Sequence, residues 1–151
     1  MNRGMGAFAP VITEDTRHRA LSSLAIGKLA GDAASDLAAP SSVDNGVLVL
    51  ERGGSTFVLE SSHPVGRGPA MVALADLNGD GRVDIVTPNS GSSDVSVLLN
   101  IGNHRFTPQV RHATSGRPFA VALGDLNGDG KPDMVVQTFD GCCNVLLNTS
   151  R

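Results

Sequence analysis

Two stretches of the chain carry the same spacing of oxygen-bearing side chains. They read Asp-Leu-Asn-Gly-Asp-Gly-Arg-Val-Asp over residues 76–84 and Asp-Leu-Asn-Gly-Asp-Gly-Lys-Pro-Asp over residues 125–133, 49 residues apart. Oxygen side chains occupy positions 1, 3, 5 and 9, glycine takes the sharp turn at position 6, and the carbonyl of position 7 can add one more oxygen. Such a donor set suits a hard cation, whereas zinc would require cysteine or histidine. The spacing therefore predicts two Ca²⁺ sites.

These stretches belong to a repeat that runs through most of the chain. Phe8, Phe57 and Phe106 are spaced at the same interval of 49 residues as the two loops. Internal repetition at this period is typical of architectures in which one supersecondary unit is stacked many times. Residues 1–151 are therefore expected to form a single repeat region, with approximate repeats at 8–56, 57–105 and 106–151.

The first repeat contains a degenerate copy of the loop at residues 28–36. Asp32 and Asp36 remain, and the substitutions are Lys28 for the first aspartate, Ala30 for the asparagine and Ala33 for the turn glycine. The loss of two ligands and the arrival of an ammonium group should abolish Ca²⁺ affinity. Lys28 is itself a candidate to occupy the place of the ion, so we expect two Ca²⁺ sites and not three.

The segments around the loops predict short β-strands. The chain is 40% hydrophobic and has 18 Gly and 8 Pro, and short apolar runs alternate with turn residues. Each repeat divides into four strand-length segments. The first is Val72–Asp76 in one repeat and Val121–Asp125 in the next, and the second is Asp84–Thr87 and Asp133–Gln137. The third is Val95–Leu99 and Cys143–Leu147, with Leu48–Leu50 in the first repeat, and the fourth starts at Phe57 or Phe106. This pattern predicts an all-β protein with three β-propeller blades of four antiparallel strands.

Residues 69–100 and 118–148 closely resemble FG-GAP/VCBS-type repeats, the blades of integrin-α-like β-propellers. Traces of the family's other signatures, Gly68-Pro-Ala-Met and Phe119-Ala-Val-Ala, fit the VCBS-like branch better than the integrin one. In this family the calcium loop joins the first and second strands of a blade. The resemblance implies two ligand sets, namely Asp76, Asn78, Asp80, the Arg82 carbonyl and Asp84, and Asp125, Asn127, Asp129, the Lys131 carbonyl and Asp133.

Other calcium loops fit less well. An EF-hand or a dockerin would place an acidic residue at position 12, where this chain has Thr87 and Val136, and both loops are flanked by expected strands. The tandem Gly-Gly-x-Gly-x-Asp units of nonapeptide arrays are absent from the sequence. A loop rich in Asp and Asn that binds no metal is the remaining alternative.

Three blades are fewer than the four to eight of most propellers. The sequence starts with a segment of fourth-strand type, Phe8–Thr13, and reaches the third strand of the last repeat at Leu147. A homodimer could therefore close one six-bladed ring, with each chain supplying the strand that its neighbour lacks. The alternative is that the sequence is a piece of a longer propeller.

Composition excludes several classes of partner and reaction. The net charge is −3, and no basic stripe with interleaved aromatic residues predicts binding to nucleic acid. We expect no membrane span, no signal peptide is visible in this chain, and no catalytic motif is found. Cys142 and Cys143 are expected to be small strand residues on opposite faces. The histidines, His18, His63, His104 and His112, are expected near turns or in fourth strands.

The resemblance implies a non-catalytic module for adhesion or for carbohydrate or protein recognition, at the cell surface or outside the cell. Arg19, Arg67 and Arg117 precede the innermost strands and could hold an anionic ligand at one mouth of the ring, although solvated loops are the commoner role of such residues. The alternative function is the propeller part of a secreted carbohydrate-active enzyme such as a polysaccharide lyase. The short loops between the expected strands argue against it.

Overall fold

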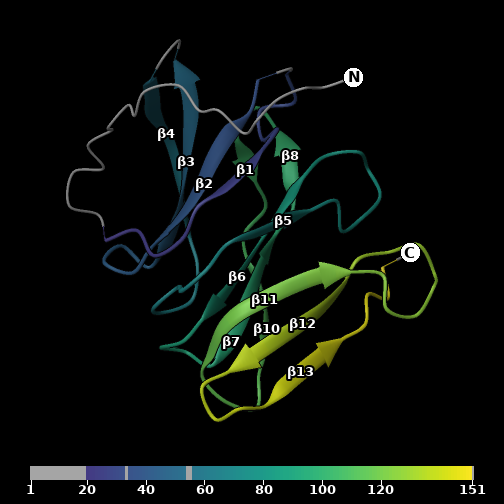
Figure 1. The fold of residues 1–151 in the computed structure, drawn as a ribbon. Helices are drawn as coiled ribbons and strands as arrows, with labels where there is room; N and C mark the ends of the chain where they lie inside the picture. The colour runs from purple at the N-terminus through teal and green to yellow at the C-terminus, as the bar shows by residue number, and fades with distance from the viewer. Residues whose placement is uncertain (1–19, 33, 54–55, 151) are drawn as a thin grey trace, which may run out of the picture.

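The structure is a computed structural model that describes residues 20–32, 34–53 and 56–150. The regular secondary structure of these residues consists of β-strands alone (Figure 1). The expected all-β class is confirmed. The described residues contain no helix that is long and apolar enough to cross a membrane. All strand pairs are antiparallel, as short connections between neighbouring strands require.

The strands form three main sheets and one small hairpin. The first sheet has the order β1 (Ala25–Gly27), β2 (Asp36–Ser41), β3 (Gly46–Gly53) and β4 (Thr56–Pro64). The second sheet has the order β5 (Ala73–Ala75), β6 (Asp84–Asn89), β7 (Asp94–Leu98) and β10 (Val110–Ala113). The third sheet contains β11 (Pro118–Gly124), β12 (Asp133–Thr138) and β13 (Cys143–Leu146), and β8 (Asn100–Gly102) pairs with β9 (Arg105–Phe106).

The expected fourth strands are only partly correct. Phe57 lies near the start of β4 as expected, but Phe106 ends the two-residue strand β9, and the fourth strand of the second sheet begins at Val110. Pro108 lies between β9 and β10, at the repeat position that Leu59 occupies in β4 of the first sheet. Because proline has no N–H to donate, it cannot continue the pairing that Leu59 makes. The third sheet has three strands among the described residues, and the Phe8–Thr13 segment lies outside them.

The second sheet lies between the other two (Figure 1), because β5 packs against β1 on one side and against β11 on the other. One apolar core joins the first and second sheets, with buried side chains that include Leu29, Ala38, Val49, Ile85, Leu98 and Phe106. A second core joins the second and third sheets, with buried side chains that include Leu77, Val86, Val97, Val121 and Val136. The three sheets are therefore stacked face to face in chain order.

The small residues of the first strands allow these strands to approach closely. A Cβ atom added to Gly27 of β1 would lie 2.7 Å from Cδ1 of Leu74 in β5, which is closer than two carbon atoms can approach. In the second core, Ala73 and Ala75 of β5 pack in the same cluster as Leu123 of β11. In both contacts, small residues in the first strand of one sheet leave room for a leucine from the first strand of the next sheet.

Candidate metal sites

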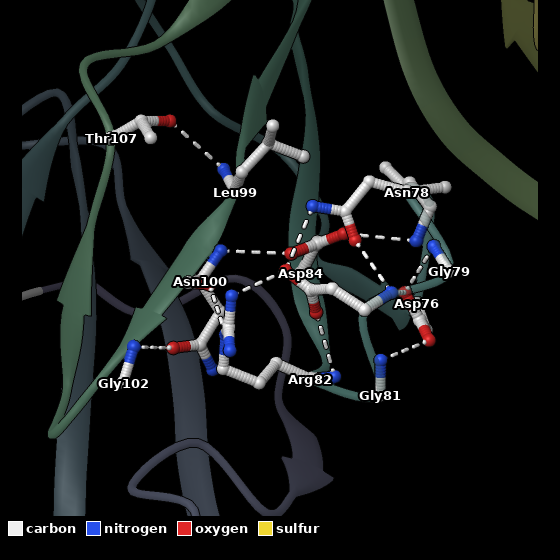
Figure 2. Close-up of polar contacts among 12 residues, drawn as sticks. Asp76, Asn78, Gly79, Gly81, Arg82, Asp84, Leu99, Asn100, Gly102 and Thr107 are labelled. Carbon is white, nitrogen blue, oxygen red and sulfur yellow. Dashed lines mark hydrogen bonds and ion pairs between the residues drawn. The ribbon is translucent and has the colours of Figure 1, made fainter. Parts of the chain in front are cut away.

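The loop at residues 76–84 connects β5 to β6 and is folded around the carboxylate of Asp76 (Figure 2). Its Oδ1 accepts hydrogen bonds from the N–H groups of Gly79 (2.8 Å) and Asp80 (3.2 Å), and its Oδ2 accepts one from Gly81 (2.8 Å). Gly79 and Gly81 have φ angles of +74° and +82°, in the left-handed region that glycine adopts without steric cost. The glycines at positions 4 and 6 therefore allow the backbone to turn around the first aspartate.

The last aspartate of the loop, Asp84, begins β6 and is completely buried. Its Oδ2 accepts a hydrogen bond from the N–H of Leu77 at 2.9 Å, and its Oδ1 accepts one from the N–H of Asn100 at 2.8 Å. Burial raises the pKa of the Asp84 carboxyl, and the nearby negative charges of Asp80 and Asp76 raise it further. The three carboxylates are therefore close enough to repel one another, which is the electrostatic condition that a bound cation relieves.

The exposed part of the loop is organised by Asp80. Its Oδ1 accepts a hydrogen bond from the N–H of Arg82 at 2.9 Å, and its Oδ2 accepts one from Asn78 Nδ2 at 2.9 Å and pairs with the guanidinium of Arg82. The N–H of Arg82 is the main cause that lowers the pKa of Asp80, followed by the amide of Asn78. Arg82 also donates from Nε to the carbonyl of Asn100 at 2.7 Å, so it ties the loop to β8.

The loop at residues 125–133 repeats this network between β11 and β12. Asp125 accepts hydrogen bonds from the N–H groups of Gly128 (2.7 Å), Asp129 (3.2 Å) and Gly130 (2.8 Å). The N–H of Gly130 is the main cause that lowers the pKa of Asp125, and that of Gly128 is the next. The side-chain contacts of the other loop residues also correspond, since Asn127 contacts Asp129, and Asp133 accepts from Leu126 and Asn148. Lys131 differs from Arg82, because it donates to the carbonyl of Ser150, two residues after Asn148.

The donor chemistry of both loops fits Ca²⁺, although the side chains are not gathered around one point. No group of three or more His, Cys, Asp or Glu side chains is close enough to hold a metal ion within residues 20–32, 34–53 and 56–150. The loop carboxylates accept N–H groups instead, and the oxygens that accept a single N–H, such as Oδ2 of Asp76 and Oδ2 of Asp125, keep a second lone pair for a cation. Coordination would require Asp80 to turn away from Arg82. The aspartate, asparagine and backbone carbonyl groups of the predicted ligand sets would bind a metal through oxygen atoms, which suits calcium and not zinc.

The degenerate loop of the first sheet is arranged differently. Lys28 is exposed, so its ammonium does not take the place of an ion beside Asp36, which is completely buried. Asp36 accepts hydrogen bonds on Oδ2 from the N–H groups of Leu29 and Ala30, and Nε2 of His104 lies 3.3 Å from the same oxygen. His104 is only 7% exposed and comes from the turn between β8 and β9. The substituted turn position, Ala33, lies outside the described residues.

Two asparagines that the sequence reasoning did not single out connect the loops of neighbouring sheets. Nδ2 of Asn100 donates to the carbonyls of Leu29 (3.1 Å) in the first loop and Val83 (3.0 Å) in the second. Its Oδ1 accepts the N–H of Gly102, so the whole amide is hydrogen-bonded. Asn148 makes the same contacts one sheet later, to the carbonyls of Leu77 (2.8 Å) and Pro132 (3.1 Å). The recurring Leu-Leu-Asn at residues 98–100 and 146–148 was the signal that could have identified them.

The other candidate residues are scattered over the sheets. His63 lies in β4, His112 lies in β10, and His18 and Arg19 are outside the described residues. Arg67 and Arg117 are exposed; Arg117 lies over the ring of Phe139, at 5.6 Å from its centre, and donates to the carbonyl of Ser90. Cys142 and Cys143 are both exposed, free thiols.

One comparison with known proteins assigns part of the chain to a family. No curated protein matches the sequence significantly. Residues 76–136 match the family model described as an FG-GAP-like repeat. This segment extends from the first aspartate of one loop, through the other loop, to Val136 of β12. The two loops and the strands between them are therefore FG-GAP-like repeat sequence, as the spacing of their aspartates and glycines had indicated.

Proposed function

We propose that this chain is a Ca²⁺-stabilised β-propeller module that binds a carbohydrate or a protein and performs no catalysis itself. The observation that supports the proposal best is the repetition of one hydrogen-bond network in the two loops, each located between the first and second strands of its sheet. FG-GAP-like repeats suggest a propeller-type module, and the sheets that pack face to face are suited to be its blades. On the family resemblance, we propose that the module works at the cell surface or outside the cell.

The proposed role of Ca²⁺ is structural. In each loop the ion would be held by the five residues of the predicted ligand set, and in the loop at residues 76–84 it would neutralise carboxylates that otherwise repel one another. Asp84 and Asp133 also accept hydrogen bonds from the backbone N–H groups of Asn100 and Asn148. The side-chain amides of these asparagines donate to carbonyls in the loop of the preceding sheet. An ion on these aspartates would therefore stabilise the contact between sheets as well as the loop itself.

Metal analysis and thermal melting test the structural role. The purified chain should contain two equivalents of Ca²⁺, and its melting temperature should fall in excess chelator and recover when Ca²⁺ is added. Ligand binding at one hundred times the dissociation constant stabilises a folded protein by about 2.7 kcal/mol per site. An unchanged melting curve in chelator would contradict the assignment of the loops.

The recognition role requires a separate experiment. The Ca²⁺-loaded chain should be retained by one class of glycan or by a protein ligand on an array, without release of a shortened product. Product release would support the alternative, in which the propeller belongs to a secreted carbohydrate-active enzyme such as a polysaccharide lyase. Because fold alone does not decide function, the ligand must be identified from the binding surface.

A further inference from the structure

The loops at residues 76–84 and 125–133 each contain an asparagine that is followed by a glycine, Asn78-Gly79 in one and Asn127-Gly128 in the other. Such a step can modify itself by deamidation. The backbone nitrogen of the glycine attacks the side-chain carbonyl carbon of the asparagine, and the amide group leaves with the glycine proton as ammonia. Water then opens the resulting succinimide ring and gives aspartate or isoaspartate. Glycine favours the ring closure because it has no side chain to hinder the approach.

Packing does not protect either of these steps. Both asparagines and the glycines that follow them are exposed. Among the described residues, a Cβ atom added to Gly79 or to Gly128 would have no heavy atom within 4 Å beyond the glycine's own chain neighbours. Water therefore reaches both steps, and their surroundings leave room for the ring to form.

The attacking nitrogen is held instead by the first aspartate of the loop (Figure 2). The N–H of Gly79 donates to Oδ1 of Asp76 at 2.8 Å, and the N–H of Gly128 donates to Oδ1 of Asp125 at 2.7 Å. A hydrogen bond to a carboxylate is roughly twice as strong as one between neutral groups. This bond must break before the glycine nitrogen can lose its proton and join the asparagine.

The side chain under attack is held as well. Oδ1 of Asn78 accepts the N–H of Asp80 at 3.1 Å, and its Nδ2 donates to Oδ2 of the same residue at 2.9 Å. Asn127 makes the same two contacts with Asp129, at 2.9 Å and 3.2 Å. The amide is therefore fixed to the residue two positions ahead, and it must be released before it can react with the glycine between them.

A third Asn-Gly step, Asn45-Gly46, is protected in another way. Oδ1 of Asn45 accepts the N–H of Gly68 at 2.9 Å. Gly46 is buried at the start of β3, where an added Cβ atom would lie 3.2 Å from the carbonyl oxygen of His63 in β4. This step is enclosed by neighbouring strands and has no contact with a loop aspartate, so it provides an internal reference.

We propose that Asn78 and Asn127 are deamidation sites, and that Asp76 and Asp125 act as positioning residues that keep them closed. Loss of the carboxylate releases the glycine N–H, and the loop then modifies itself with water as the only other reactant. Either product is permanent. Isoaspartate lengthens the main chain by one carbon atom before the glycine, whereas aspartate adds a negative charge to a loop that already carries several.

The inference goes beyond the proposed function and depends on neither Ca²⁺ binding nor the propeller arrangement. Its test is therefore run on the full chain in excess chelator, at mildly alkaline pH, so that no metal contributes to the protection. Peptide mass analysis over time gives the rate at which each asparagine gains the mass of an amide-to-carboxyl exchange. Enzymatic methylation of isoaspartyl groups identifies the second product.

Asp76→Ala should speed the deamidation of Asn78 about tenfold, because it removes a hydrogen bond to a charged acceptor. Asn127 and Asn45 should keep their wild-type rates in this variant. Asp125→Ala should give the converse result, with Asn127 accelerated and Asn78 unchanged. Deamidation of Asn78 at the wild-type rate in Asp76→Ala would overturn the proposal.

Two further measurements separate the hydrogen bond from general unfolding. Asp76→Asn keeps an oxygen acceptor for the N–H of Gly79, so Asn78 should react more slowly in it than in Asp76→Ala; equal rates would overturn the role of the hydrogen bond. In the wild-type chain, Asn78 and Asn127 should react about tenfold more slowly when folded than in urea. Equal rates in the folded and unfolded chain would overturn the proposal whatever the variants show.

Discussion

At the residue level, the aspartates of the two loops have different environments although they share one motif. Asp125, at position 1, is exposed, and the backbone N–H groups of the loop lower the pKa of its carboxyl. Asp84, at position 9, is buried, and burial raises the pKa of its carboxyl. The first aspartate shapes the loop, and the last aspartate joins the loop to the core. The aspartate at position 5 is exposed in both loops and makes its contacts within the loop, away from the apolar core, which makes it the best residue for a test of metal binding.

Asp80→Ala and Asp129→Ala should each remove one bound Ca²⁺, because each deletes one carboxylate ligand from one predicted site. Metal analysis after gel filtration should give one equivalent for each single variant and none for the double variant. Asp32→Ala in the degenerate loop is the matched control and should leave two equivalents. Loss of both ions in a single variant would show that the two loops are not independent sites.

His63 should make stability depend on pH. Its partial burial lowers the pKa of its imidazole from the ordinary value of 6.5, so the folded state favours the neutral ring. The stabilising effect is therefore complete above the unfolded pKa and is lost as the pH falls through the folded pKa. Urea unfolding at pH 7.5 and at successively lower pH should show this loss, and His63→Gln should reduce it. An equal pH dependence in wild type and variant would contradict the role of His63.

At the level of elements, the contacts between sheets depend on hydrogen bonds as well as on apolar burial. Asn100 begins β8 and Asn148 follows β13, and each amide donates to one carbonyl in its own sheet's loop and one in the loop of the preceding sheet. Asn100 is 1% exposed, so water cannot replace these contacts easily. The sheets are therefore held in register at the end that carries the loops at residues 76–84 and 125–133.

Asn100→Ala should lower the free energy of unfolding by about 1–3 kcal/mol, because it leaves the carbonyls of Leu29 and Val83 without their donor. Asn100→Asp should also destabilise, since a carboxylate cannot donate to these carbonyls. Ser42→Ala, at an exposed position, is the control and should stay within about 0.5 kcal/mol of wild type. Chemical denaturation measures all three, and a stable Asn100→Ala variant would show that the amide does not hold the sheets.

At the level of the whole molecule, the first and third sheets each leave apolar side chains exposed among the described residues. Leu24 and Ile26 on the first sheet and Val145 and Leu147 on the third are all more than half exposed, and β13 has an unpaired edge among the described residues. Exposed apolar faces and free strand edges lead to association with another chain. In a repeat architecture, terminal units need a cap or a neighbour for the same reason.

Association through these exposed faces would make thermal stability depend on protein concentration. Association that accompanies folding shifts the apparent stability by mass action, so the melting temperature should rise as the protein is concentrated. Differential scanning fluorimetry with an external dye, over a hundredfold range of concentration, measures this shift. A melting temperature that is independent of concentration would show that these faces do not associate.

The sequence by itself was sufficient for the period, the strand-rich class and the two loops, because these features depend on local chemistry. Glycines at fixed positions turn the backbone, alternating residues form strands, and aspartates near such turns accept the N–H groups of their own loop. The family match over residues 76–136 agrees with that reading. The error in strand placement at Phe106 arose where Pro108 ends the pairing that its counterpart Leu59 continues, and Cys142, also expected in a strand, lies just before β13.

Only the tertiary structure decided which groups meet between sheets. Asn100 reaches a carbonyl 71 residues earlier in the chain, and His104, not Lys28, lies beside Asp36. Phe106 packs in the apolar core between the first and second sheets, although in the chain it lies between β7 and β10, two strands of the second sheet. Nothing local distinguishes these residues from their neighbours, since their partners are set by which faces of the sheets lie together. That arrangement results from the burial of apolar surface across long stretches of chain, which no single motif encodes.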